Sequence, residues 1–389
     1  MTDHVAAVNR LTTSWLERLG PGSGVMSGAG LWPLLAVLAA SADDPGRDEL
    51  AAATGVPADE AMEAAAVVLR ALDDADGVDA ALGLWARADA QVRPDWRAEV
   101  PAGTLGELSG DPAVDQPVLD AWARERTGGL IEKFPIETGP HLAITLATAL
   151  ALRTTWVRRF SDEALVPSSG PWQGTRLAGL KRTTPDLDDL VVATTPAGEI
   201  TATRIEGDNG LDVHLVLGGA DRGPAEILPP AVAVIAGDHP VRIGSELLAD
   251  HGADLGPGVS VVPATRAGLA VATPRFTVRS EHDLMRHADI FGLTAVSGPG
   301  EGHFSRISAV PLKVDEARQS AVAIFSALGF EAAAVTAIGL RAVSMPSFTT
   351  RGLAVAYDRP FGFVAVHRES GLVLFAGWVD AAEAWSAPR

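Results

Sequence analysis

The chain has 389 residues, which is more than an average domain but within the range of one large domain. Apolar residues make up 47% and charged residues 21% of the sequence, so a sizeable core is expected and general disorder is excluded. The formal net charge of −18 argues against nucleic acid and anionic membranes as partners, because like charges repel. The chain has no cysteine, which excludes disulfides, thiolate catalysis and cysteine-based metal sites.

The start of the sequence bears on export and on membranes. Met1-Thr2-Asp3-His4 carries no basic segment followed by an apolar stretch, so no secretion signal is visible. No apolar run approaches the roughly 18 residues that a membrane span requires. We therefore expect a cytoplasmic protein or one exported without a leader, and the compartment stays open because the absence of cysteine does not fix it.

The first third of the chain has a helical pattern. Ala, Glu and Leu dominate it, and Leu11, Trp15 and Leu19 recur at four-residue spacing. Further helices are expected at residues 31–40, 48–54, 58–72 and 118–126, the last of which ends at Gly128-Gly129.

From residue 142 onward, short β-prone runs alternate with Gly, Pro and Asp. Helices followed by strands, with few alternating βαβ units, predict the α+β class. With no internal repeat and no long linker, we expect one domain over residues 1–389. The expected strands are residues 144–152, 200–205, 211–217, 231–235, 271–278, 310–314, 321–325, 361–367 and 372–379, with one helical segment at residues 280–291.

Patterns that would indicate an enzyme are missing from the sequence. There is no Gly-x-x-x-x-Gly-Lys-Ser/Thr phosphate loop and no Gly-x-Ser-x-Gly nucleophile elbow. His282 and His287 lie five residues apart rather than four, so they fail the two-histidine zinc pattern, and a solvated histidine or one satisfied in the core is the better interpretation of each. We expect no catalytic activity, no metal and no cofactor.

The end of the chain carries the most informative pattern. Residues 358–361 read Asp-Arg-Pro-Phe at the entry to one strand-like run, and a second such run extends over residues 371–379. Upstream, residues 329–337 are rich in alanine and follow a strand-like segment without a gap. Three earlier segments continue the same order, at Met26-Ser27, at residues 122–131 and at residues 150–160.

This ordered set resembles the serpin family of serine protease inhibitors, in a bacterial-type member, over nearly the whole chain. The resemblance implies an α+β fold with three β-sheets, about eight or nine surrounding helices and an exposed reactive-centre loop. It also implies a monomer whose partner is a serine protease. Such an inhibitor is a suicide substrate: the protease cuts the loop and forms an acyl-enzyme, and the cut loop then inserts into the main sheet as a strand.

The hinge that the resemblance implies is formed by small residues, which can slide between two strands. Strand alternation places alternate hinge residues on one face of the inserting strand, with Phe330 the first to enter the core. The family usually has a small polar residue there, so we expect the ring to be hard to seat, at a cost of about 1–3 kcal/mol. This departure motivates the alternative of a non-inhibitory binding or carrier protein. The hinge residues are Gly329, Phe330, Glu331, Ala332, Ala333, Ala334, Val335, Thr336 and Ala337.

A second implied region is the place where the main sheet opens. Gly30, Thr148 and Gln319 stand where the family usually has Ser, Asn and His, so we expect its hydrogen-bonded cluster to be weakened or rebuilt. The residues expected in this region are Ser27, Gly30, Thr148, Trp156 and Gln319.

The scissile bond is left between alternatives by the sequence. Counting forward from Gly329 by the family's interval gives Val343-Ser344, whereas counting back from Pro360 gives Thr349-Thr350. We favour Val343-Ser344, because the sheet fixes the length that inserts while the trailing segment can absorb extra residues. Val343 suits an elastase-like protease, which we therefore favour over a trypsin-like one. The trypsin-like alternatives are Arg341 and Arg351.

Overall fold

The computed structural model describes residues 2–101, 103–139, 143–168, 170–250, 254–299, 302–330 and 349–385. Its N-terminal part is helical, as the alanine-rich and leucine-rich pattern predicts. The first six helices are α1 (Thr2–Leu16), α2 (Gly28–Ser41), α3 (Gly46–Thr54), α4 (Ala61–Asp73), α5 (Pro94–Glu99) and α6 (Pro112–Arg126). The later helices are α7 (Pro224–Ala236), α8 (Gly244–Ala249), α9 (Ala288–Phe291) and α10 (Thr294–Ser297).

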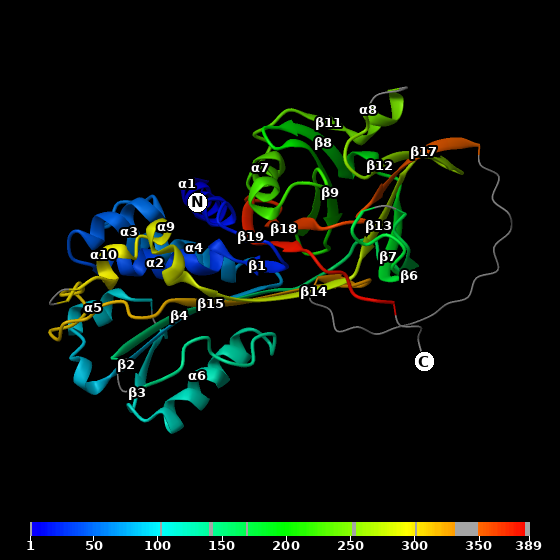
Figure 1. The fold of residues 1–389 in the computed structure, drawn as a ribbon. Helices are drawn as coiled ribbons and strands as arrows, with labels where there is room; N and C mark the ends of the chain where they lie inside the picture. Colours follow the sequence, from blue (N-terminus) through cyan, green and yellow to red (C-terminus); the bar gives the residue numbers. More distant parts are fainter. Residues whose placement is uncertain are drawn as a thin grey trace.

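The largest sheet has seven strands in the order β1-β19-β18-β10-β9-β8-β11. Its C-terminal hairpin, β18 with β19, is almost wholly buried, which confirms the two strands expected at the end of the chain. Helices α1 and α7 pack near this sheet (Figure 1). The strands are β1 (Gly24–Met26), β8 (Leu190–Thr195), β9 (Gly198–Glu206), β10 (Leu211–Leu217), β11 (Val241–Ile243), β18 (Phe361–His367) and β19 (Leu372–Val379).

A second sheet has five strands in the order β12-β17-β13-β7-β6. In it β17 lies between two strands, antiparallel to β12 and parallel to β13. Figure 1 shows it at the right of the molecule. The strands are β6 (Ser161–Leu165), β7 (Leu177–Thr184), β12 (Val259–Ala264), β13 (Leu269–Pro274) and β17 (Thr350–Ala356).

The remaining strands form two smaller sheets, in the orders β3-β2-β4 and β14-β15-β16-β5. Only Arg153 separates β4 from β5, so the two sheets meet where β16 pairs with β5. Away from this junction, β4 and β15 form no pair with each other within the described residues. The strands are β2 (Val78–Arg87), β3 (Leu105–Leu108), β4 (Ile144–Leu152), β5 (Thr154–Thr155), β14 (Phe276–Asp283), β15 (Arg318–Phe325) and β16 (Gly329–Phe330).

The gap between β4 and β15 has a helix on each side. On one side lies α2, which is buried along nearly its whole length. On the other side lies α6, whose Trp122 packs edge-to-face on Trp85 of β2 with ring centroids 4.9 Å apart. Figure 1 shows α2 and α6 on opposite faces of these strands. The gap is therefore enclosed by secondary structure on both faces.

The α+β class is confirmed, but some details of the sequence prediction are wrong. The described residues form four sheets rather than three, because the expected main sheet is divided along the gap, and ten α-helices rather than eight or nine. Residues 231–235 lie in α7, not in a strand. Residues 280–283 complete β14 instead of starting a helix, because they pair with β15. Residues 310–314 form no strand.

Candidate functional site: the hinge and the gap in the sheet

The start of the hinge is a tight turn that joins β15 to β16. The Trp156 backbone N–H donates to the Leu328 carbonyl at 2.9 Å, and its indole Nε1 donates to the Ser326 carbonyl at 2.9 Å. The Ser326 backbone N–H in turn donates to the Gly329 carbonyl at 3.0 Å. Trp156 therefore anchors the turn through both its backbone and its side chain. Both hydrogen bonds go to the start of the hinge and not to Ser27, Gly30, Thr148 or Gln319. Ser326 was not predicted, although a serine at the start of a tight turn is a recognisable signal.

Gly329 is required by the closeness of β5. A β-carbon at this position would lie 2.1 Å from the Thr154 carbonyl oxygen, a distance at which backbone would have to move. Gly329 pairs with Thr155 of β5 within the four-stranded sheet. The glycine therefore lets the chain enter between β15 and β5 at its first step.

Phe330 is already seated in the core, contrary to the expected difficulty in placing its ring. Its side chain is only 2% exposed, and its ring centroid lies 6.2 Å from that of Phe363. On one side Phe330 pairs with Phe325 of β15, and on the other with Thr154 of β5. The first residue of the expected insertion thus already occupies a strand position between β15 and β5.

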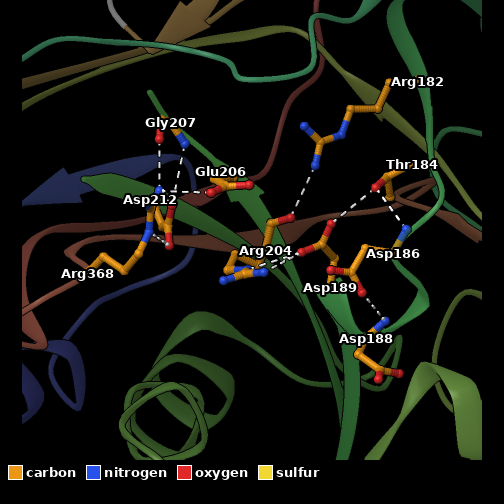
Figure 2. A network of polar contacts seen from close by, with 10 residues as sticks. All are labelled: Arg182, Thr184, Asp186, Asp188, Asp189, Arg204, Glu206, Gly207, Asp212 and Arg368. Atoms are coloured by element: carbon orange, nitrogen blue, oxygen red, sulfur yellow. Dashed lines mark hydrogen bonds and ion pairs between the residues drawn. The ribbon is translucent and has the colours of Figure 1, made fainter. Parts of the chain in front are cut away.

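Aromatic side chains pack around Phe325, the β15 partner of Phe330. The Phe325 ring stacks on Phe276 with centroids 5.2 Å apart, and Trp156 and Phe160 pack on Phe325 from 4.9 and 5.6 Å. The Arg182 guanidinium lies over the Phe160 ring at 4.9 Å. Figure 2 shows Arg182 reaching the backbone of Arg204, to whose carbonyl it donates at 3.2 Å. Loss of solvation lowers the pKa of Arg182 to about 10, which still leaves it charged at neutral pH.

Most of the expected loop lies outside the described residues. This applies to Val343, Ser344, Arg341 and the hinge residues 331–337. Thr349 and Arg351, by contrast, are described. Arg351 is a β17 residue paired with Pro263 of β12, and the Thr349 N–H donates to the Ala264 carbonyl at 3.2 Å. Thr349 and Arg351, two of the three alternative cleavage positions, are thus tied to β12, the edge strand of the five-stranded sheet.

The expected sheet-opening cluster is rebuilt around the first turn of α2. Ser27 caps this helix, because its Oγ accepts the Gly30 N–H at 2.9 Å and donates to the Leu374 carbonyl at 2.6 Å. Thr148 of β4 donates from its Oγ1 to the Gly30 carbonyl. Gln319 of β15 accepts the Ser27 N–H and donates to the Ser27 carbonyl, each at 2.9 Å. No sequence signal marked the Leu374 carbonyl, since any residue supplies one.

This arrangement explains how the gap is held. Thr148 and Gln319 lie on the two strands that flank it, and each is bonded to the first turn of α2 rather than to the other strand. The flanking strands are therefore fixed at one level without a ladder of hydrogen bonds between them. Separating them further, or placing a strand between them, breaks no β4–β15 ladder among the described residues.

A cavity of about 350 Å³ lies at the gap, next to α2. Its walls come from α2, from the start of β4 and from the segment that leads into β15. The lining is mostly apolar, with Lys313, Asp315 and Arg318 among its charged residues. The apolar lining from α2 and β4 comprises Leu31, Leu34, Leu35, Leu38, Ile144 and Leu146.

A second, smaller hollow of about 200 Å³ lies between α1, α7 and the seven-stranded sheet. His214 of β10 is part of its lining, and loss of solvation lowers the pKa of His214 to about 4, so the imidazole is neutral at pH 7. Arg204 and Arg368 also line it. Arg368 holds Asp212 through two contacts of 2.6 and 2.9 Å, and Arg204 is paired with Asp189 at 2.8 Å.

Neither a metal site nor a membrane span is found among the described residues. No group of three or more His, Asp or Glu side chains in that part of the chain is placed to hold a metal ion. Among the same residues, no helix combines the length and the apolar character needed to cross a bilayer.

Comparison with known proteins agrees with the resemblance. A family model described as "Serpin (serine protease inhibitor)" matches residues 261–381. Serpin-Z2A of Oryza sativa subsp. japonica is 27% identical over 91% of this chain and 90% of its own length. Plasminogen activator inhibitor 1 of Sus scrofa is 33% identical, over 30% of this chain and 27% of its own. The solved complex of thyroxine-binding globulin with thyroxine has a TM-score of 0.72 at 13% identity, covering 98% of this chain and 99% of that one.

The architecture is the α+β serpin fold, as the hinge, the gap and the C-terminal hairpin together define it. In sequence, the chain is similar to the serpin family model over residues 261–381 and to the serpins named above, one of which is named as a plasminogen activator inhibitor.

Proposed function

We propose that this protein inhibits a serine protease as a suicide substrate. The protease's serine oxygen attacks the carbonyl carbon of Val343, the bond to the Ser344 nitrogen breaks, and Ser344 leaves as the new amine end. An ester then links Val343 to the enzyme. Insertion of residues 330–343 as a strand of about 45 Å would carry the tethered protease across the molecule before water can release it.

The observation that carries this proposal is the state of the hinge. Gly329 and Phe330 already lie between β15 and β5, directly above an unpaired gap between β4 and β15. Only continuation of the same strand is needed for insertion. A buried Phe330 also removes the main objection to inhibition, because the ring needs no new seat when the loop moves.

We place the cut at Val343-Ser344. Thr349 and Arg351 are paired with β12 or its flank, and a protease requires an extended segment free to enter its cleft. An elastase-like enzyme remains our preferred partner over a trypsin-like one, which would cut after Arg341. We further propose that the protein acts as a single-domain monomer of bacterial type, with no nucleic-acid or membrane partner and no catalytic activity of its own.

One gel tests inhibition. The protein is mixed with an elastase and, separately, with a trypsin, and each mixture is denatured and separated by size. We expect a covalent band at the summed mass with elastase. The matched control Val343→Asp should lose that band with elastase, because a small apolar pocket excludes a carboxylate. Cleavage by every protease with no such band would overturn the proposal.

A carrier function is the second candidate, and the hollow beside His214 favours it. It combines apolar walls with a neutral imidazole and two arginines that are each paired with an aspartate, which suits a small, largely apolar ligand with a few polar groups. Thyroxine-binding globulin, which shares the fold, is solved with thyroxine bound. Titration with thyroxine, followed by quenching of tryptophan fluorescence, tests this function. The variant His214→Leu should abolish saturable quenching, and no saturable quenching by the unaltered protein would contradict it.

A further inference from the structure

We propose that Arg182 is a positioning residue for the hinge, because its guanidinium fixes the segment that holds the turn before Gly329. This inference rests on the proposed function, in which the hinge must move before water releases the protease. It adds a residue that lies outside the expected hinge and outside the cluster at the first turn of α2. Arg182 acts through residues 156–160, the segment that connects β5 to β6.

This connecting segment supports the turn that precedes the hinge. Trp156 donates to the Leu328 carbonyl from its backbone and to the Ser326 carbonyl from its indole, each at 2.9 Å. The Phe160 backbone N–H donates to the Ala327 carbonyl at 3.0 Å. Three consecutive carbonyls of the turn are therefore held by one segment. Any movement of the segment would move the turn, and with it the start of β16.

Arg182 ties this segment to two of the sheets. It lies on β7 of the five-stranded sheet, and only 7% of its surface is exposed. Its Nη1 donates to the Arg158 carbonyl of the segment at 3.1 Å. Its Nη2 donates to the Arg204 carbonyl of β9, in the seven-stranded sheet, at 3.2 Å (Figure 2). Because the guanidinium also lies over the Phe160 ring at 4.9 Å, it contacts the segment through both backbone and side chain.

Arg182 has no partner of opposite charge among the described residues. The carboxylate that attracts it most, that of Asp189, is paired with Arg204 at 2.8 Å. The Nε of Arg182 is buried without a hydrogen-bond partner. Burial of an unpaired charge is costly, and a well-packed apolar side chain is often as stable in its place. Stability alone therefore does not account for Arg182, whereas an apolar side chain could not replace its bridge between two carbonyls.

The variant Arg182→Met tests this role, because it keeps an unbranched side chain and removes the bridge. The variant and the unaltered protein are each mixed with elastase, and the ratio of cut protein to covalent complex is measured on a denaturing gel. A looser turn delays the hinge while water continues to release the ester, so we expect this ratio to rise about threefold to tenfold. The rate of the first cut should not change, because Arg182 is buried. An unchanged ratio would overturn the inference.

Two further variants separate positioning from general stability and from charge. Arg47 of α3 also donates to a backbone carbonyl, that of Ala40 at 3.2 Å, and pairs with Asp59. Arg47→Met should therefore lower the Tm without raising the ratio, and an equal rise in this control would mean that lost stability is the cause. Arg182→Lys keeps the charge, but one ammonium group lacks the fork that reaches two carbonyls, so it should trap no better than Arg182→Met. Full trapping by Arg182→Lys would contradict the bridge.

Hydrogen exchange of the uncut protein tests the same role without a protease. In Arg182→Met and in Arg182→Lys, amides of residues 156–160 and 326–330 should exchange faster, because their hydrogen bonds open more often. The control Lys181→Met removes the exposed cation next to Arg182 on β7 and should leave this exchange unchanged. Faster exchange without any covalent complex in the unaltered protein would overturn the proposed function and still support the hold of Arg182 on the segment. Equal exchange in the Arg182 variants and the control would overturn the inference, whatever the gel shows.

Discussion

Gln319 holds both backbone polar groups of Ser27, accepting its N–H and donating to its carbonyl, each at 2.9 Å. Gln319 lies on β15 and Ser27 caps α2, so one side chain ties an edge of the gap to the helix beside it. The residues are 292 positions apart in the sequence. One edge of β15 is held by its ladder with β14, and this contact ties β15 to α2 where β4 gives it no ladder.

Removal of this clamp should destabilise the intact protein. In Gln319→Ala, two partly buried groups of Ser27 lose their partner, so we expect the free energy of unfolding to fall by about 1–3 kcal/mol. Urea unfolding measures it. Gln173→Ala is the control, because Gln173 is exposed and should change stability by less than about 0.5 kcal/mol. Equal stability of the two variants would show that the clamp contributes nothing.

The sequence predicted the parts of the fold that depend on local pattern. Residues 144–152, 211–217, 361–367 and 372–379 are strands with the expected bounds, because each of these largely apolar runs is followed directly by Gly, Asp or Arg. Residues 231–235 are a short run of Ala, Val and Ile, which periodicity alone cannot assign. They lie in α7, which starts at Pro224 and is capped by Glu226.

For the residues around the first turn of α2, the sequence predicted which positions belong together but not the hydrogen bonds between them. Ser27, Gly30, Thr148 and Gln319 do meet at the first turn of α2, as the resemblance implied. Which donor serves which acceptor depends on strands brought together by the fold, and no local pattern encodes it. The burial of Phe330 could not be predicted either, for the same reason. Its neighbour Phe363 lies on β18, a strand of another sheet.

Loss of the Phe330 ring should destabilise the intact protein where β16 lies between β15 and β5. The side chain is 2% exposed, so Phe330→Ala is expected to lower the free energy of unfolding of the intact protein by about 3–5 kcal/mol. Urea unfolding with Val157→Ala as the control measures this loss, since Val157 is near the hinge in sequence but 53% exposed.

The same residue makes a prediction about inhibition. Because the ring is already seated, Phe330→Thr should yield no more covalent complex with elastase than the unaltered protein does. The yield of the high-mass band on a denaturing gel measures it. A clear gain in complex would mean that the ring hinders insertion after all.

Gly329 should tolerate no side chain. In Gly329→Ala the new methyl would meet the Thr154 carbonyl oxygen at 2.1 Å, so the pairing of β16 with β5 must open. We expect a lower Tm and faster cutting near residues 326–330 by a dilute, non-specific protease. Gly20→Ala is the matched control, because no atom lies within 4 Å of the added methyl and Gly20 has no left-handed φ. A Gly329→Ala protein as resistant as this control would contradict the close approach.

Acid should destabilise the protein through His214. Its folded-state pKa is about 4, below the ordinary 6.5, so the unfolded chain binds the proton more readily between these values. The contribution is complete above pH 6.5 and is lost as pH falls toward 4, by about 2–3 kcal/mol. Burial also lowers the pKa of His282, which acts in the same direction. Urea unfolding from pH 7 to 4.5 should show a shallower slope in His214→Gln, and an unchanged slope would contradict this assignment.

The central claim is that cutting the loop releases a strand that the gap can accept. The most direct measurement is the Tm of the purified protein before and after a single cut in the loop, under one set of conditions. We expect the cut protein to melt higher by about 10 °C or more, since a strand inserted between β4 and β15 adds two ladders of hydrogen bonds. Equal melting temperatures would contradict it.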